Sequence, residues 1–182
     1  MSLDRSSSLD QQQTNEAFSD KWETYSSSKE REGFYQFQRE WYLTLYGFSS
    51  EKEFKKHLLG CEVIFDAGCG LGYKAAWLAE LAPHALVIGM DFSEAAQHAA
   101  ETYAALPNLF FVQGNIASTG LRDGVVDYVN CDQVIMHTED PEVTFAELVR
   151  MTVRSMSKKA ITGEDFMCIP ISRLMYFPNS KL

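Results

Sequence analysis

Several features are missing from this 182-residue chain. No apolar run approaches the ~20 residues that a membrane-spanning helix needs. The N-terminus is rich in serine and glutamine and lacks the apolar core of an export signal. The four cysteines form no C-x-x-C pair, and their long, irregular spacing is not typical of a zinc site or a disulfide framework. These absences predict a cytoplasmic protein with reduced thiols, no metal site and no membrane association.

Positive charge is also scarce. The sequence has 16 lysines and arginines against 25 aspartates and glutamates, which gives a formal net charge of −9. No cluster of basic residues interrupts this excess of acid. Because an acidic surface repels phosphate backbones and anionic lipid, we expect no nucleic-acid partner.

Composition divides the chain into three segments. Residues 1–15 are polar and of low complexity, which predicts a disordered tail. Residues 16–60 are rich in aromatics at helical spacing and predict an N-terminal helical cap of two helices, broken near residues 26–28. Residues 61–182 form the third segment. In the second helix of the cap, we expect the aromatic and apolar series to face the core, namely Phe34, Phe37, Trp41, Leu45 and Phe48.

Strand and helix patterns alternate from residue 61 onward. We expect strands at 63–66, 85–90, 109–113 and 125–131, and helices at 71–81, 93–106 and 141–154. Strands that alternate with helices form right-handed crossovers and a parallel sheet. The predicted fold class is therefore α/β, a Rossmann-like, doubly wound and mainly parallel sheet with helices on both faces.

A glycine-rich turn joins the first strand to the first helix of this domain. It reads G-x-G-x-G from Gly68 through Gly70 to Gly72, and Asp66 precedes it. A dinucleotide site requires G-x-G-x-x-G, but Tyr73 occupies the place of its third glycine. A carboxylate at the strand end would also repel a pyrophosphate. It would attract the ammonium and sulfonium groups of S-adenosylmethionine, which this turn therefore favours.

Asp91 ends the second predicted strand, nineteen residues after Gly72. An acid in this place can accept hydrogen bonds from both ribose hydroxyls of a nucleotide. The alternative is that Asp91 only caps the helix that begins near Ser93. The spacing favours the ribose role.

Four ordered motifs resemble those of the class I S-adenosylmethionine-dependent methyltransferases, specifically the small-molecule group called type 11. The match extends from about residue 18 to residue 150, and its motifs lie at residues 66–72, 87–93, 111–116 and 127–138. The third motif has Asn115 where the family usually has aspartate, and the fourth keeps only His137 of two adjacent histidines. The N-terminal segment 18–25 also resembles one that folds over the cofactor in some relatives.

The resemblance implies S-adenosylmethionine as cofactor, S-adenosylhomocysteine as product and a small molecule as methyl acceptor. His137 is the candidate general base, and Trp22 and Tyr25 are candidates to lie against the sulfonium. The expected cofactor-binding residues are Asp66, Gly68, Cys69, Gly70, Gly72, Asp91, Phe92, Asn115, Ile116, Cys131, Trp22 and Tyr25.

The sequence departs from the family after residue 150. The family has a Lys-Pro-Gly-Gly-like turn there, then a fifth strand, a helix and a closing hairpin, whereas residues 151–182 show no such turn. We therefore expect a C-terminally truncated domain whose sheet is incomplete. The strand at 125–131 then has a bare edge, which either stays open or is covered in a homodimer.

Three functional classes follow from these patterns. The first is an active methyltransferase that acts on a small-molecule acceptor. The second is a cofactor-binding but inactive fragment, or a subunit completed by a partner. The third, a nicotinamide-dependent oxidoreductase, conflicts with Asp66 and Tyr73.

Overall fold

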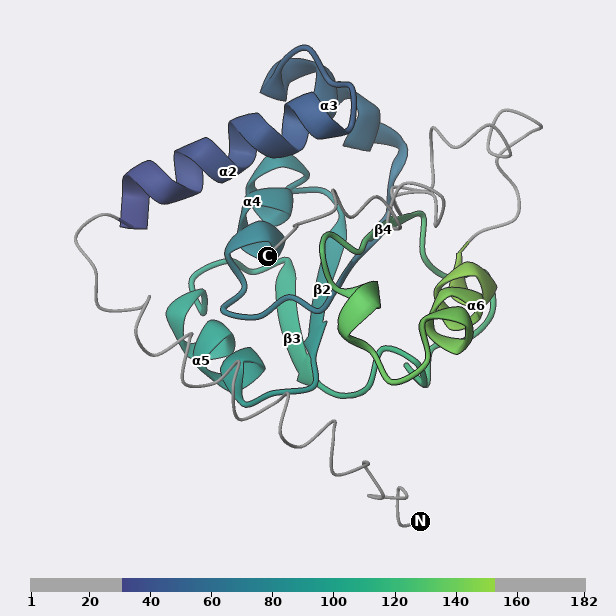
Figure 1. Ribbon diagram of the computed structural model, residues 1–182. Helices are drawn as coiled ribbons and strands as arrows, with labels where there is room; N and C mark the ends of the chain where they lie inside the picture. The colour runs from purple at the N-terminus through teal and green to yellow at the C-terminus, as the bar shows by residue number, and fades with distance from the viewer. Residues whose placement is uncertain (1–30, 153–182) are drawn as a thin grey trace, which may run out of the picture.

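The computed structural model describes residues 31–152. Four parallel strands form one sheet in the order β3-β2-β1-β4, and helices cover both of its faces (Figure 1). The described elements follow one another along the chain as α2 (Arg31–Leu45), α3 (Glu51–His57), η1 (Leu58–Gly60), β1 (Val63–Ala67), α4 (Tyr73–Leu81), β2 (Leu86–Asp91), α5 (Ala95–Thr102), β3 (Leu109–Gln113), β4 (Tyr128–Asn130), η2 (Ile135–His137) and α6 (Pro141–Met151).

The sheet separates two hydrophobic cores. Successive side chains of a strand point to opposite faces, so Ile64 of β1 packs with α3 and α4 while Phe65 packs with α6. Both side chains are fully buried. This arrangement confirms the predicted Rossmann-like fold class with helices on both faces of a parallel sheet.

Local sequence signals explain where two of the helices begin. The Asp140 carboxylate accepts hydrogen bonds from the backbone N–H groups of Glu142 and Val143, and Pro141 occupies the first turn of α6. Ser50 caps α3 by accepting from the N–H of Glu53. The sequence interpretation did not include α3, although this S-x-x-E pattern signals a helix start.

The fourth strand is shorter than predicted. Residues 125–131 were expected to form it, but β4 covers only Tyr128–Asn130. Just before it, the N–H groups of Val125 and Val126 both donate to the carbonyl of Met151, and Val126 forms a parallel bridge with Thr152. The chain that leaves α6 therefore already lies beside the edge expected to be bare. The expectation of an incomplete sheet after residue 152 falls on residues outside the described range.

The prediction that the second helix turns its apolar series to the core is wrong for Phe37, Trp41 and Leu45. It is confirmed for Phe48, which follows α2 and packs against the core, and the side chain of Phe34 lies outside the described residues. Phe37 is 62% exposed and Trp41 and Leu45 are each 38% exposed, whereas Tyr42 is 1% exposed. The helix carries aromatics on more than one side, so apolar spacing alone did not identify the face that packs. Tyr42 is buried because its hydroxyl reaches polar groups of the sheet.

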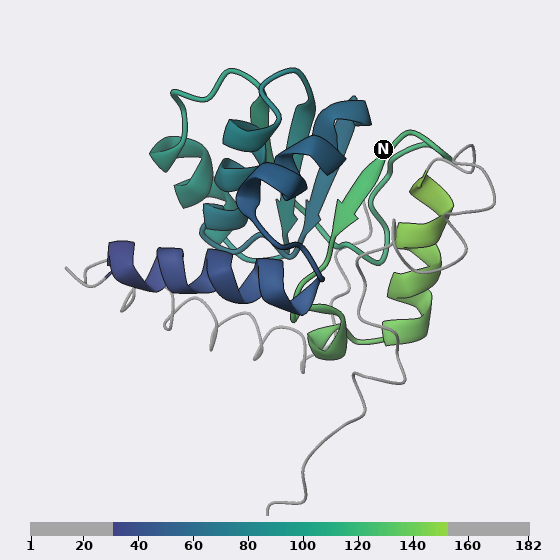
Figure 2. The same cartoon turned by 90° about the horizontal axis from the view of Figure 1, so that it is seen from above.

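Figure 2 shows α2 level with the ends to which the strand arrows point, and Figure 1 shows it beside α4. No helix within residues 31–152 is long and apolar enough to cross a membrane.

Candidate cofactor-binding site

Polar side chains gather where the four parallel strands end. Asp66 is paired in register with Gly89 of β2 and with Asn130 of β4. Asp91 ends β2 and is paired with Gln113, the last residue of β3. Ligands of open α/β sheets bind at this carboxyl edge, so the fold brings the predicted motifs to the expected place.

The glycines of the turn after β1 adopt conformations that other residues avoid. Gly68, Gly70 and Gly72 have φ values of 72°, 51° and 77°, all in the left-handed region. A Cβ on Gly68 would overlap the Val134 side chain, and one on Gly72 would lie 2.7 Å from the Cβ of Ala99. The turn therefore requires glycine both for its backbone angles and for its close packing.

Asp91 holds the glycine turn against β2. Its Oδ2 accepts from the N–H of Gly70 at 2.7 Å, and its Oδ1 accepts from the N–H and the hydroxyl of Ser93 at 2.9 and 2.6 Å. Oδ1 already accepts two hydrogen bonds and Oδ2 accepts one, so one lone pair, on Oδ2, remains to accept from a ribose hydroxyl. Helix α5 begins at Ala95, whose N–H is 3.3 Å from the Ser93 hydroxyl.

Asp66 is the most deeply buried acid of the site, at 2% exposed. Its Oδ1 accepts from the Asn130 side-chain amide at 2.6 Å. Its Oδ2 is buried without a hydrogen-bond partner among the residues that the structure describes. Burial raises the pKa of this carboxyl to about 6, although the Asn130 hydrogen bond and the charge of Lys74 act in the opposite direction.

The other predicted cofactor residues surround this edge with different degrees of exposure. Phe92 and Asn115 are half-buried, and the side-chain oxygen Oδ1 of Asn115 accepts from the N–H of Ala117 at 2.9 Å. Cys69, Ile116 and Cys131 are buried at 9%, 6% and 3% exposed, and the last two belong to the core beneath α6.

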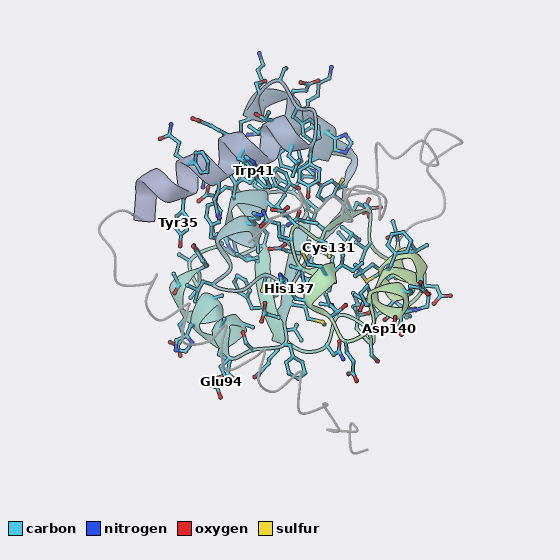
Figure 3. All side chains as sticks on the ribbon, in the orientation of Figure 1. Tyr35, Trp41, Glu94, Cys131, His137 and Asp140 are labelled. Atoms are coloured by element: carbon cyan, nitrogen blue, oxygen red, sulfur yellow. The ribbon has the colours of Figure 1, made fainter. Side chains whose placement is uncertain are left out.

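The candidate base, His137, lies in the segment that follows β4, at the same edge of the sheet. His137 ends the short helix η2, which follows β4, and it is exposed. Figure 3 labels it together with Cys131, the residue at which the chain leaves β4. Trp22 and Tyr25 lie outside the described residues.

Polar residues that the sequence interpretation passed over also meet at the site. Asp132 is 7% exposed and forms an ion pair with Lys74. The Tyr46 hydroxyl also donates to Asp132, at 3.0 Å. Within residues 31–152, no cluster of three or more His, Cys, Asp or Glu side chains could hold a metal ion.

The model of the methyltransferase domain family matches residues 65–155, which is half of the chain. The match begins in β1 and includes the glycine turn, Asp91, β3, β4 and α6. The chain belongs to this methyltransferase domain family. It is the family in which S-adenosylmethionine is the methyl donor.

Individual relatives agree with this methyltransferase assignment. A protein of Mycolicibacterium smegmatis described as a probable S-adenosylmethionine-dependent methyltransferase is 38% identical over 88 residues, which are 48% of this chain and 33% of that protein. The magnesium protoporphyrin IX methyltransferase of Synechocystis PCC 6803 with bound S-adenosylhomocysteine has a TM-score of 0.54 at 25% identity, over 79% of this chain and 68% of its own. A methyltransferase of Aquifex aeolicus has a TM-score of 0.51 at 22% identity, over 61% and 62% of the two chains.

The curated relatives are much longer than the region that matches. The chain covers 22%, 33%, 27% and 38% of the lengths of four such relatives.

Proposed function

We propose that this methyltransferase domain binds S-adenosylmethionine at the carboxyl edge of its sheet and transfers the methyl group to a small-molecule acceptor. The observation that carries the proposal is the buried Oδ2 of Asp66, which has no partner among the described residues. A buried acceptor without a donor is costly, and an ammonium group of a ligand would satisfy it.

The remaining groups of the edge fit the rest of this cofactor. The left-handed glycines at 68, 70 and 72 place bare backbone beside the ligand. Asp91 has one spare lone pair, on Oδ2, for a ribose hydroxyl, and Phe92 and Ile116 offer apolar contact to an adenine ring. Asn115 would accept from the adenine amino group. Cys69 and Cys131 line the same edge, and Trp22 and Tyr25 are proposed to cover the sulfonium.

The residues of this site act mainly by position. S-adenosylmethionine brings a methyl group that its cationic sulfur already activates, so the protein needs to align an acceptor and exclude water. Asp66 would anchor the amino-acid end of the ligand and Asp91 its ribose, which fixes the reacting end between them. His137 would take a proton from an acceptor that must lose one.

A small-molecule acceptor is supported by the Synechocystis neighbour, whose printed substrate is magnesium protoporphyrin IX. The acidic character of the chain, at −9, disfavours nucleic acid as acceptor. The proposal also includes a cytoplasmic location and, of the two alternatives stated for the edge beside β4, the homodimer.

Calorimetry with S-adenosylmethionine and S-adenosylhomocysteine tests the cofactor, and transfer of a labelled methyl group to pooled metabolites tests the reaction. We expect binding of both ligands and labelling that His137→Ala reduces for acceptors with an acidic proton. Binding without any labelling would support the alternative, an inactive domain or a subunit completed by a partner. Absence of binding at millimolar ligand would contradict the proposal.

A further inference from the structure

A hydrogen-bond network of four buried side chains leads from α2 to the strand end that precedes the glycine turn. The hydroxyls of Tyr128 and Tyr42 lie 2.9 Å apart, and the Tyr42 hydroxyl lies 2.9 Å from Asn130 Oδ1. Asn130 Nδ2 lies 2.6 Å from Asp66 Oδ1. All four residues are at most 2% exposed, so water does not compete for these bonds.

The chemistry of the groups fixes the direction of every hydrogen bond in this network. An ionised carboxylate only accepts, so Asn130 turns its amide NH₂ toward Asp66 and its carbonyl oxygen toward Tyr42. Tyr42 then gives its single proton to Asn130, and Tyr128 gives its proton to Tyr42. Burial raises the pKa of both tyrosines, so both remain protonated donors.

The hydrogen-bond network leaves one carboxylate oxygen of Asp66 available to accept from a ligand. Because Asn130 holds Oδ1, the carboxylate has a fixed orientation, and Oδ2 stays without a partner among the described residues. Aligned hydrogen bonds in a dry interior also polarise one another. The three upstream residues therefore stabilise the ionised, oriented form of Asp66.

Building on the proposed function, we propose that Tyr128, Tyr42 and Asn130 are positioning residues that hold the Asp66 carboxylate ionised, with Oδ2 ready to accept from the amino group of the bound cofactor. Through Tyr42, helix α2 thereby contributes to ligand binding without touching the ligand. The signal lies in residues far apart in the sequence, because Tyr42 and Asn130 are separated by 88 positions.

The pH dependence of binding should report this arrangement. The groups that act on Asp66 are Asn130 and Lys74, which lower its pKa, and Asp132 and Asp91, which raise it; burial is the largest influence and brings the value to about 6. The ionised form binds an ammonium, so affinity should fall as pH falls through this value. Removal of the Asn130 donor raises the pKa further and moves the loss of affinity to higher pH.

Calorimetry from pH 5.5 to 8 with two ligands makes the test specific. S-adenosylhomocysteine carries the amino group, whereas 5′-methylthioadenosine shares the nucleoside and lacks the amino-acid moiety. In Asn130→Leu we expect affinity for S-adenosylhomocysteine at pH 6.5 to fall by roughly tenfold or more, and affinity for 5′-methylthioadenosine to change by less than about twofold. Tyr42→Phe should show a smaller loss in the same direction, with its pH midpoint also raised.

Phe54→Leu is the matched control for stability. Phe54 is fully buried and its ring packs against those of Tyr42 and Tyr128. The variant therefore weakens the same core and leaves every hydrogen bond of the network in place. It should keep the pH midpoint of the unmodified protein. If Asn130→Leu does not fold, Tyr42→Phe, which removes a single oxygen atom, carries the test.

Two results would overturn the inference while the proposed function stands. One is the same pH midpoint for S-adenosylhomocysteine in the unmodified protein, Asn130→Leu and Tyr42→Phe. The other is an equal loss of affinity for both ligands, which would indicate general damage to the site. If the unmodified protein binds neither ligand, the proposed function itself fails and the inference fails with it.

Discussion

Replacement of Asp91 by alanine should weaken both the fold and the binding of cofactor. The Asp91 carboxylate accepts from the N–H of Gly70 and from the N–H and hydroxyl of Ser93. Gly70 and Ser93 are buried, so Asp91→Ala leaves two buried N–H groups without their acceptor. The same substitution removes the group proposed to accept from a ribose hydroxyl.

The size of each effect follows from these contacts. An unsatisfied buried donor costs about 1–3 kcal/mol, and because Asp91 is half-buried, water can enter part of the vacated space. We expect a loss of roughly 2–4 kcal/mol in the free energy of unfolding, which lowers Tm by roughly 5–15 °C. Loss of the ribose contacts should cost a further ~1–3 kcal/mol of binding, or roughly 5–150-fold in Kd.

Thermal unfolding without ligand measures the first effect, and calorimetry with S-adenosylhomocysteine below the lowered Tm measures the second. Ser93→Ala is the control, because it removes one hydroxyl bond to Asp91 and leaves the carboxylate in place. It should lower Tm slightly and bind almost normally. An unchanged Kd in folded Asp91→Ala would refute the ribose assignment. An unchanged Tm would refute the role of Asp91 in stabilising the glycine turn.

Three further substitutions test other parts of the structure. Gly70→Val should abolish cofactor binding in calorimetry, because φ at this position is 51° and a branched side chain is strained there; normal binding would place the site elsewhere. Hydrogen bonds from Arg150 lower the pKa of Glu147 to about 2 from 4.5, a shift of roughly 3 kcal/mol before screening. Arg150 is 35% exposed, so in urea unfolding Glu147→Gln should cost ~1–2 kcal/mol at pH 7. This stabilisation by an acid of lowered pKa is present above pH 4.5 and is lost as pH falls toward 2, so a difference that persists at pH 2 would contradict the ionic explanation. Lys74→Met leaves Asp132 buried without its ion-pair partner and should cost about 2–4 kcal/mol in the same assay, whereas Lys74→Met combined with Asp132→Asn should recover part of the loss; no recovery would show that the pair is not coupled.

The amino-acid sequence by itself determined the chemistry of the strand ends. The glycine turn was predictable because three left-handed residues in one short loop require glycine locally, whatever surrounds them. Asp66 and Asp91 were predictable for a similar reason, since each ends an apolar run and parallel strands bring their carboxyl ends to one edge. The alternation of strands with helices then sufficed for the fold class.

Only the tertiary structure decided which face of α2 is buried and what Asp66 contacts. Phe37 and Trp41 are the more apolar residues of that helix, yet they are exposed, while Tyr42 is buried. The reason is that the hydroxyl of Tyr42 meets Tyr128 and Asn130, which lie 86 and 88 residues away along the chain. The packing of a helix with aromatics on several sides depends on partners supplied by the sheet, and no local spacing encodes them. The same separation in sequence made the hydrogen-bond network that ends on Asp66 unpredictable, because its members form a network only once the fold brings them together.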